Sequence, residues 1–131
     1  MIARVLLQLL SSYLLIWAPG TFAVELLTTW PSIGMRGPLA WIELTAHGAV
    51  AMFCALAGRM LRIGSPSAPV AAAAAVGVRA VSSLQSLFWT TLPQDVAPGM
   101  RLPMAVITCA NAVFWLVVIR VLPAEAGSDE E

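Results

Sequence analysis

Four long stretches of apolar residues, separated by segments rich in Pro, Gly and Ser, limit what this chain can fold into. A helix that crosses the hydrocarbon core of a bilayer needs roughly 20 mostly apolar residues. The stretches that meet this length are residues 2–27, 38–61, 69–91 and 102–122. The segments between them, such as TTWPSIGMRG and LPQDVAPGMR, have the composition of turns. The sequence therefore predicts an all-α membrane protein, a bundle of four transmembrane helices.

The balance of apolar and charged residues supports the same fold class. Of the 131 residues, 60% are hydrophobic and only 11% are charged, whereas about a quarter are charged in an ordinary soluble domain. Inside lipid only helices and closed barrels satisfy every backbone polar group, and runs such as VAAAAAVGV lack the alternation of a barrel strand. All seven basic residues are Arg and the net charge is zero. We therefore expect the lipid bilayer as a partner and no nucleic acid.

The first stretch contains Pro19, which cannot donate a backbone hydrogen bond to Leu15. Its ring also clashes with that carbonyl, so we expect a transmembrane helix that is kinked at Pro19. The basic start, apolar middle and small residues Thr21 and Ala23 also fit a cleavable signal peptide. The apolar run continues through VELL, which favours an uncleaved span. We assign residues 1–122 to the transmembrane domain and expect the acidic tail, 123–131, to be disordered.

The distribution of Arg predicts the orientation. Four spans put both termini on one side of the membrane. That side would carry four basic residues and the other side two; they are Arg4, Arg59, Arg62 and Arg120 against Arg36 and Arg101. Because basic residues concentrate in cytoplasmic segments, we expect a protein of a bacterial inner membrane with both termini in the cytoplasm.

Glu43 and His47 lie one helical turn apart within the apolar second stretch. On a helical wheel they share a face of small residues, opposite bulky apolar side chains. The third stretch likewise puts Arg79, Ser83 and Ser86 on one face. Small residues at such faces let membrane helices approach closely. The polar faces are therefore predicted to point into the bundle.

Arg79 lies near the middle of the third span, where an unpaired charge costs at least roughly 2.5–3.5 kcal/mol. We expect Glu43 to be its counter-ion, with His47 as the next choice and the side-chain carbonyl of Asn111 as a neutral acceptor. Glu25 lies near the outer end of the first span. The candidate site for a ligand or proton comprises Glu25, Glu43, His47, Arg79, Ser83, Ser86 and Asn111.

Two plainer interpretations of this cluster remain open. Buried ion pairs can serve only to fix which helix faces which, and an interior His is often simply a hydrogen-bonded core residue. His47 is the only His, so a haem would need Met ligation or a symmetric dimer. A closed zinc site needs four ligands, which no second cluster supplies, and no metal or cofactor is predicted. Cys54 and Cys109 lie at depths that differ by roughly 10 Å on helical rise, too far for a disulfide.

The length and four-span plan are similar to those of small multidrug-type transporters. Members of that family carry a membrane-embedded Glu in the first half of the first span, where this chain has Gln8, Ser11 and Ser12. The resemblance therefore covers size and span number, and no transport residue is carried over from it.

Three functions are compatible with these features. The first is binding or moving a small solute, ion or proton at the polar cluster, with a small anionic or lipid ligand. The second is a non-catalytic membrane subunit of a larger complex. The third is an intramembrane enzyme acting on a lipid or isoprenoid, with Glu43 and His47 as acid and base. We expect a homo-oligomer or an assembly with other membrane subunits, and whether the chain is an enzyme stays open.

Overall fold

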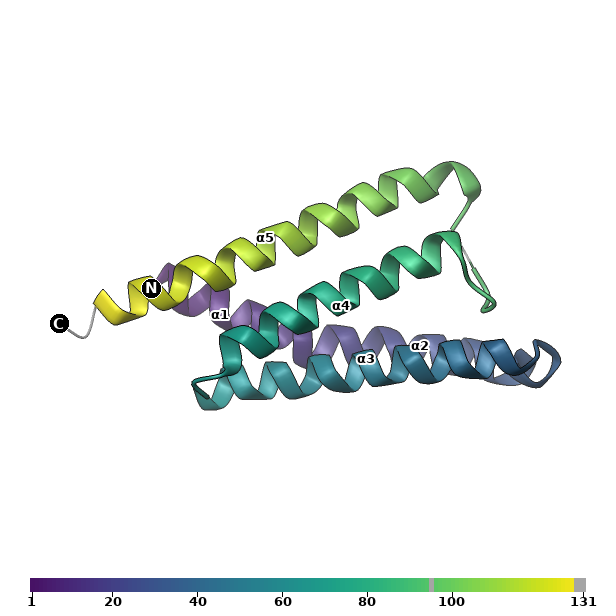
Figure 1. The fold of residues 1–131 in the computed structure, drawn as a ribbon, viewed down its shortest axis with the longest axis horizontal. Coiled ribbons are helices and arrows are strands. Elements are labelled where there is room, and N and C mark those ends of the chain that lie inside the picture. Colours follow the sequence, from purple (N-terminus) through teal and green to yellow (C-terminus); the bar gives the residue numbers. More distant parts are fainter. Residues whose placement is uncertain (95, 129–131) are drawn as a thin grey trace.

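The computed structural model describes residues 1–94 and 96–128, with side chains to residue 121. Within that part of the chain, four helical segments are long and apolar enough to cross a membrane: Ile2–Met35, Pro38–Ile63, Ala68–Phe88 and Pro98–Val121. They are the four predicted spans. The first extends to Met35 instead of residue 27, and the other boundaries differ by at most four residues. The first helix begins, and the last described helix ends, at the same end of the molecule (Figure 1). We call this the terminal end. The opposite end carries the α2–α3 and α4–α5 connections.

The first span consists of α1 (Ile2–Ser12), a π-helical turn (Tyr13–Trp17), α2 (Ala18–Thr29) and a 3-10 segment (Trp30–Met35). The π turn lies directly before Pro19, and in it the backbone N–H of Ala18 donates to the carbonyl of Tyr13. This wider turn gives the proline ring the room that a regular α-helix denies it. The helix axis changes direction between α1 and α2 (Figure 1), which confirms the predicted kink.

Helices α3 (Pro38–Ile63) and α4 (Ala68–Phe88) form an antiparallel pair joined by a short turn. Gly64 ends α3 in the left-handed conformation, with φ of 70°. The backbone N–H of Ser65 donates to Met60 and that of Gly64 to Leu61. These two bonds satisfy carbonyls that the last turn of a helix leaves free. After a 3-10 turn, Pro98–Met100, helix α5 (Arg101–Ser128) returns to the terminal end.

Small residues hold the helices close together. At Gly58 on α3, an added Cβ would lie 3.0 Å from the backbone of both Ser11 and Leu15. The Ser11 hydroxyl donates to the Gly58 carbonyl over 3.0 Å. Cys54 and Ala57 of α3 are also fully buried. The predicted small-residue face of α3 is thus a packing face, as is usual between membrane helices.

Two apolar clusters leave a polar layer between them. The larger cluster, towards the terminal end, includes Leu10, Leu14, Cys54, Ala75 and Trp115. The smaller one, at the opposite end, consists of Ile33, Ala40, Leu44 and Leu92, with Phe22 and Leu26 packed against it. Bulky apolar side chains on the outer faces of α3 and α4 are exposed, among them Trp41, Met52, Leu56, Val81 and Phe88.

Helix α5 extends through Ser128, past the predicted end of the last span at residue 122. The disorder expected for the tail, 123–131, stays a prediction. Residues 129–131 lie outside the described part of the chain.

Candidate functional site

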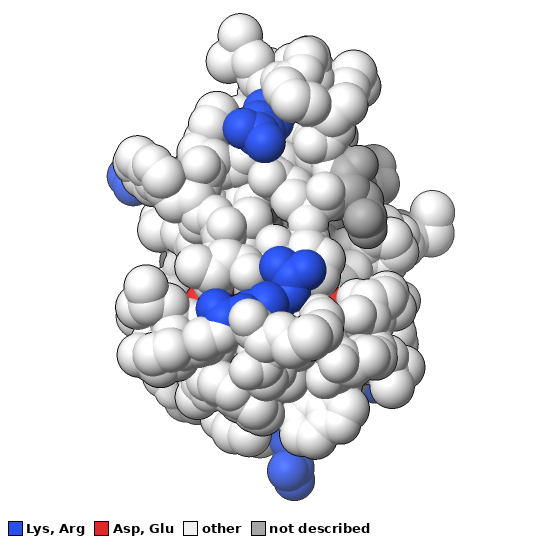
Figure 2. Space-filling view, turned by 90° about the vertical axis from the view of Figure 1, so that its right-hand side faces the viewer, with Lys and Arg blue, Asp and Glu red and all other residues white. Residues whose placement is uncertain are grey.

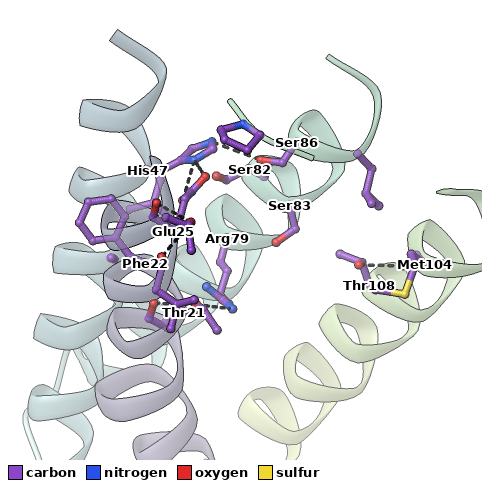
Figure 3. A pocket seen from close by; sticks show the side chains of 17 residues that line it. Thr21, Phe22, Glu25, His47, Arg79, Ser82, Ser83, Ser86, Met104 and Thr108 are labelled. Carbon is purple, nitrogen blue, oxygen red and sulfur yellow. Dashed lines mark hydrogen bonds and ion pairs between the residues drawn. The ribbon is translucent and has the colours of Figure 1, made fainter. Parts of the chain in front are cut away.

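A cavity of about 450 Å³ lies in the polar layer and is lined by residues of all four spans. The side chains that give it chemical character are Thr21, Glu25, His47, Arg79, Ser82, Ser83 and Ser86. In Figure 3 they point from α2, α3 and α4 towards one another, with Met104 and Thr108 of α5 on the far side. The cavity therefore combines a cation, a carboxylate, an imidazole and several hydroxyls.

His47 and Glu25 form the only ion pair among the described residues. The Nδ1 atom of His47 lies 2.9 Å from Oε1 and 3.1 Å from Oε2 of Glu25. The His47 side chain is 9% exposed and that of Glu25 is 31% exposed. Helix α3 presents His47 on its buried face, one turn from Leu44 and Ala51. The carboxylate thus reaches a buried imidazole from the cavity side.

The other ring nitrogen of His47 faces α4. Its Nε2 atom lies 3.1 Å from Oε1 of Gln85 and 3.3 Å from the Ser86 hydroxyl. The amide nitrogen of Gln85 donates to Oε1 of Glu43 over 3.1 Å and to the carbonyl of Trp89. These two acceptors fix the amide orientation, because a carbonyl and a carboxylate can only accept. The amide oxygen of Gln85 must then face His47.

This arrangement places a proton on Nε2. An amide oxygen has no hydrogen to give, so the bond to Gln85 exists only if Nε2 donates. The Nδ1 contact with Glu25 needs one further proton, carried either by the imidazole or by the carboxyl group. The Glu25–His47 pair therefore shares one exchangeable proton, and it borders the cavity.

Glu43 has a different role from the one predicted. Its carboxylate accepts from the Thr90 hydroxyl at 2.6 Å, and from the backbone N–H and the hydroxyl of Thr91 at 2.8 and 2.5 Å. Both threonines follow the end of α4, where backbone groups no longer have hydrogen-bond partners within a helix. Glu43 therefore anchors this segment to α3 and holds the amide of Gln85. It does not line the cavity.

Arg79 is bound by neutral groups, so the predicted Arg79–Glu43 pairing is wrong. Its Nε donates to the Tyr13 hydroxyl at 3.0 Å and its Nη2 to the Thr21 hydroxyl at 3.3 Å. The guanidinium carbon also lies 5.5 Å from the centroid of the Tyr13 ring, within the range of a cation–π interaction. Because the first span brings two hydroxyls to Nε and Nη2 of Arg79, the guanidinium is held in place without a carboxylate.

Asn111 also differs from its prediction. It does not accept from Arg79; its amide nitrogen donates to the Tyr13 hydroxyl at 3.2 Å. Tyr13 stacks on Trp115 of α5, with ring centroids 5.9 Å apart. Tyr13 thus links Arg79 of α4 to α5. Asn111 is exposed and lies outside the main cavity.

Basic groups also occupy the opposite end. Figure 2 looks onto this end: arginine atoms lie across its middle, with only small areas of Asp or Glu atoms visible beside them. Arg36 donates through Nη1 to the Thr91 carbonyl and through Nε to the Ser32 hydroxyl, each over 3.0 Å. Arg36 thus binds Thr91, the residue that also donates to Glu43.

The structure brings together Glu25, His47, Arg79, Ser83 and Ser86 from the predicted site, and attaches Glu43 to it through Gln85. Sequence reasoning missed Gln85, Tyr13 and Thr21. The available signal was that any polar side chain within an apolar span needs a partner. Comparison of the chain with protein-family models, with curated proteins and with solved structures finds no match.

Proposed function

We propose that the protein binds a small anionic solute beside Arg79, and that the Glu25–His47 pair exchanges a proton when the solute binds. We place this activity in a bacterial inner membrane with both termini in the cytoplasm. The excess of Arg at the terminal end supports that orientation.

The observation that carries the proposal is the way in which Arg79 is held. A guanidinium has five N–H donors, of which Tyr13 and Thr21 engage one each. Within the described residues, the N–H groups on Nη1 have no acceptor, and no carboxylate lies within 4.0 Å of the guanidinium. A carboxylate or phosphate can accept two parallel bonds from such a fork. The seryl hydroxyls of α4 would supply further donors.

The second part of the proposal rests on the shared position of the two charged groups. Arg79 and the Glu25–His47 pair line the same cavity. An anion that enters beside them makes the local potential more negative, which favours the state in which the pair holds its shared proton. Proton uptake and anion binding are therefore expected to be coupled.

The contacts also bear on the enzyme hypothesis. Ser86, His47 and Glu25 stand in the order of a Ser–His–carboxylate triad, with 3.3 and 2.9 Å between them. A nucleophilic Ser86 would need an unprotonated Nε2 to accept its proton. The amide oxygen of Gln85, 3.1 Å from Nε2, favours a proton at that atom. This contact supports a proton-carrying role over activation of Ser86.

Isothermal titration calorimetry on the detergent-purified protein tests the proposal. Sodium acetate, succinate, phosphate and sulfate are titrated separately in chloride-free buffer. We expect at least one of them to bind, and Arg79→Met to abolish that binding. Arg79→Lys keeps the charge but loses the fork, and should weaken binding at least tenfold. Arg59→Met is the matched control, because Arg59 is exposed and does not line the cavity.

Repeating the titration in two buffers with different ionisation enthalpies measures the protons taken up. Wild-type protein should take up protons on binding, while Glu25→Gln and His47→Gln should bind the anion with little or no uptake. The proposal fails if none of the four anions binds, or if Arg79→Met binds as well as Arg59→Met. Unchanged uptake in Glu25→Gln would refute the proton coupling alone.

A further inference from the structure

A second groove with basic side chains lies at the terminal end, between α1 and α3. It has a volume of about 590 Å³ and lies apart from the cavity described above. Its lining consists of Arg4, Leu7, Gln8, Ser11, Ser12, Leu61 and Arg62. The proposed function uses none of these residues.

The polar groups of the groove are set by helical spacing. Arg4, Gln8 and Ser12 follow one another at intervals of four residues, so they form one line along α1. Arg62 comes from the last turn of α3. Two guanidinium groups from different helices thus border the same groove, together with one amide and two hydroxyls.

Arg62 is held in place by Ser11. Its Nε donates to the Ser11 hydroxyl at 3.1 Å, and that hydroxyl donates to the Gly58 carbonyl. The contact fixes the side chain and leaves the N–H groups of Nη1 and Nη2 without acceptors among the described residues. Arg4 and Arg62 are both exposed. The carboxylates with described side chains are Glu25, which binds His47, and Glu43, which binds Thr90. Positive charge in the groove is therefore uncompensated by the described side chains.

The position of the groove indicates its ligand. Arg4 lies in the first turn of α1 and Arg62 in the last turn of α3, the level at which lipid headgroups meet a membrane-spanning helix. Leu7 and Leu61 give the groove apolar walls. Basic pockets between membrane helices bind the phosphates of anionic lipids, and acyl chains suit an apolar wall. We propose that this groove binds the headgroup phosphate of an anionic phospholipid.

Native mass spectrometry of the full-length protein in detergent tests the assignment. The probes are phosphatidylglycerol, phosphatidylcholine and inorganic phosphate at equal ionic strength. We expect phosphatidylglycerol to bind with at least tenfold higher affinity than phosphatidylcholine. The double variant Arg4→Gln/Arg62→Gln should lose this preference. Arg4→Lys/Arg62→Lys should retain part of it, because the charges remain.

The matched control is Arg59→Gln/Arg120→Gln. It removes the same charge from the same end of the molecule, and neither residue lines the groove. This control should bind phosphatidylglycerol like the wild type. Equal losses in both double variants would mean a general charge effect and would overturn the proposal. Binding of inorganic phosphate as tight as that of phosphatidylglycerol would overturn the lipid assignment, as would equal affinity for the two lipids.

Discussion

Three helical glycines provide a graded test of how tightly the helices pack. An alanine at Gly58 would place its Cβ 3.0 Å from Leu15 N and Ser11 O, and 3.1 Å from Leu15 Cβ. For an alanine at Gly48, the three atoms nearest to the Cβ all belong to the ring of Phe22, at 3.0–3.6 Å. An alanine at Gly77 would have nothing within 4 Å. We expect stability to fall in the order Gly77→Ala, Gly48→Ala, Gly58→Ala.

The magnitude at Gly58 follows from these contacts. Non-bonded carbon atoms prefer separations of about 3.5–4.0 Å, and both nearest atoms are backbone, so α1 and α3 must move apart. Overpacking of this kind costs about 1–3 kcal/mol. The movement also lengthens the 3.0 Å bond from Ser11 to the Gly58 carbonyl, and such interhelical bonds average about 0.6 kcal/mol. Alanine recovers about 0.5–1 kcal/mol through helix propensity, which leaves a net loss of roughly 1–3 kcal/mol.

The other two positions lack this backbone clash. Gly77→Ala should raise the free energy of unfolding by up to about 1 kcal/mol. At Gly48 the Phe22 ring can turn aside, so Gly48→Ala should fall between the other two. The measurement is unfolding in mixed micelles of dodecyl maltoside and sodium dodecyl sulfate, followed by circular dichroism. If Gly58→Ala proves as stable as Gly77→Ala, the close approach of α1 to α3 is refuted.

Three further predictions follow from the contacts of the polar layer and from the Arg distribution. Tyr13→Phe removes the hydroxyl that accepts from Arg79 and Asn111, and should lower the free energy of unfolding by about 0.6–1.7 kcal/mol; an unchanged value in the mixed-micelle assay would contradict the assigned contacts. In wild-type protein, ¹⁵N NMR of the single His should show a proton on Nε2, and Gln85→Leu should reduce that population; an unprotonated Nε2 in the wild type would refute the argument from the amide orientation. A green fluorescent protein fused to the C-terminus should fluoresce in a bacterial host, since the proposed orientation leaves the tail in the cytoplasm; a dark but full-length fusion would reverse the orientation.

The sequence by itself determined the fold class and the surfaces that face lipid. Span length and apolar composition are local properties, and water-free surroundings leave the backbone few alternatives to a helix. The kink at Pro19 was equally local, because a proline ring clashes with its own chain wherever it occurs in a helix. The buried face of α3 followed from helical periodicity, which placed His47 inside correctly.

Tertiary structure alone decided the partners in the polar layer. Depth along a span can be counted from the sequence, but the direction of a side chain around the helix axis depends on how the helices are turned against one another. The π turn adds a residue before Ala18 and so rotates the following part of the span by about 100° relative to the preceding part. Tyr13, the first residue of the π turn, and Thr21, which follows the turn, both bind Arg79. Glu43 instead binds the threonines beyond α4, and Glu25 binds His47. The pattern of polar and bulky apolar residues around a membrane helix indicates which face points into the bundle. It carries no information about which of several hydrophilic groups at similar depth will meet.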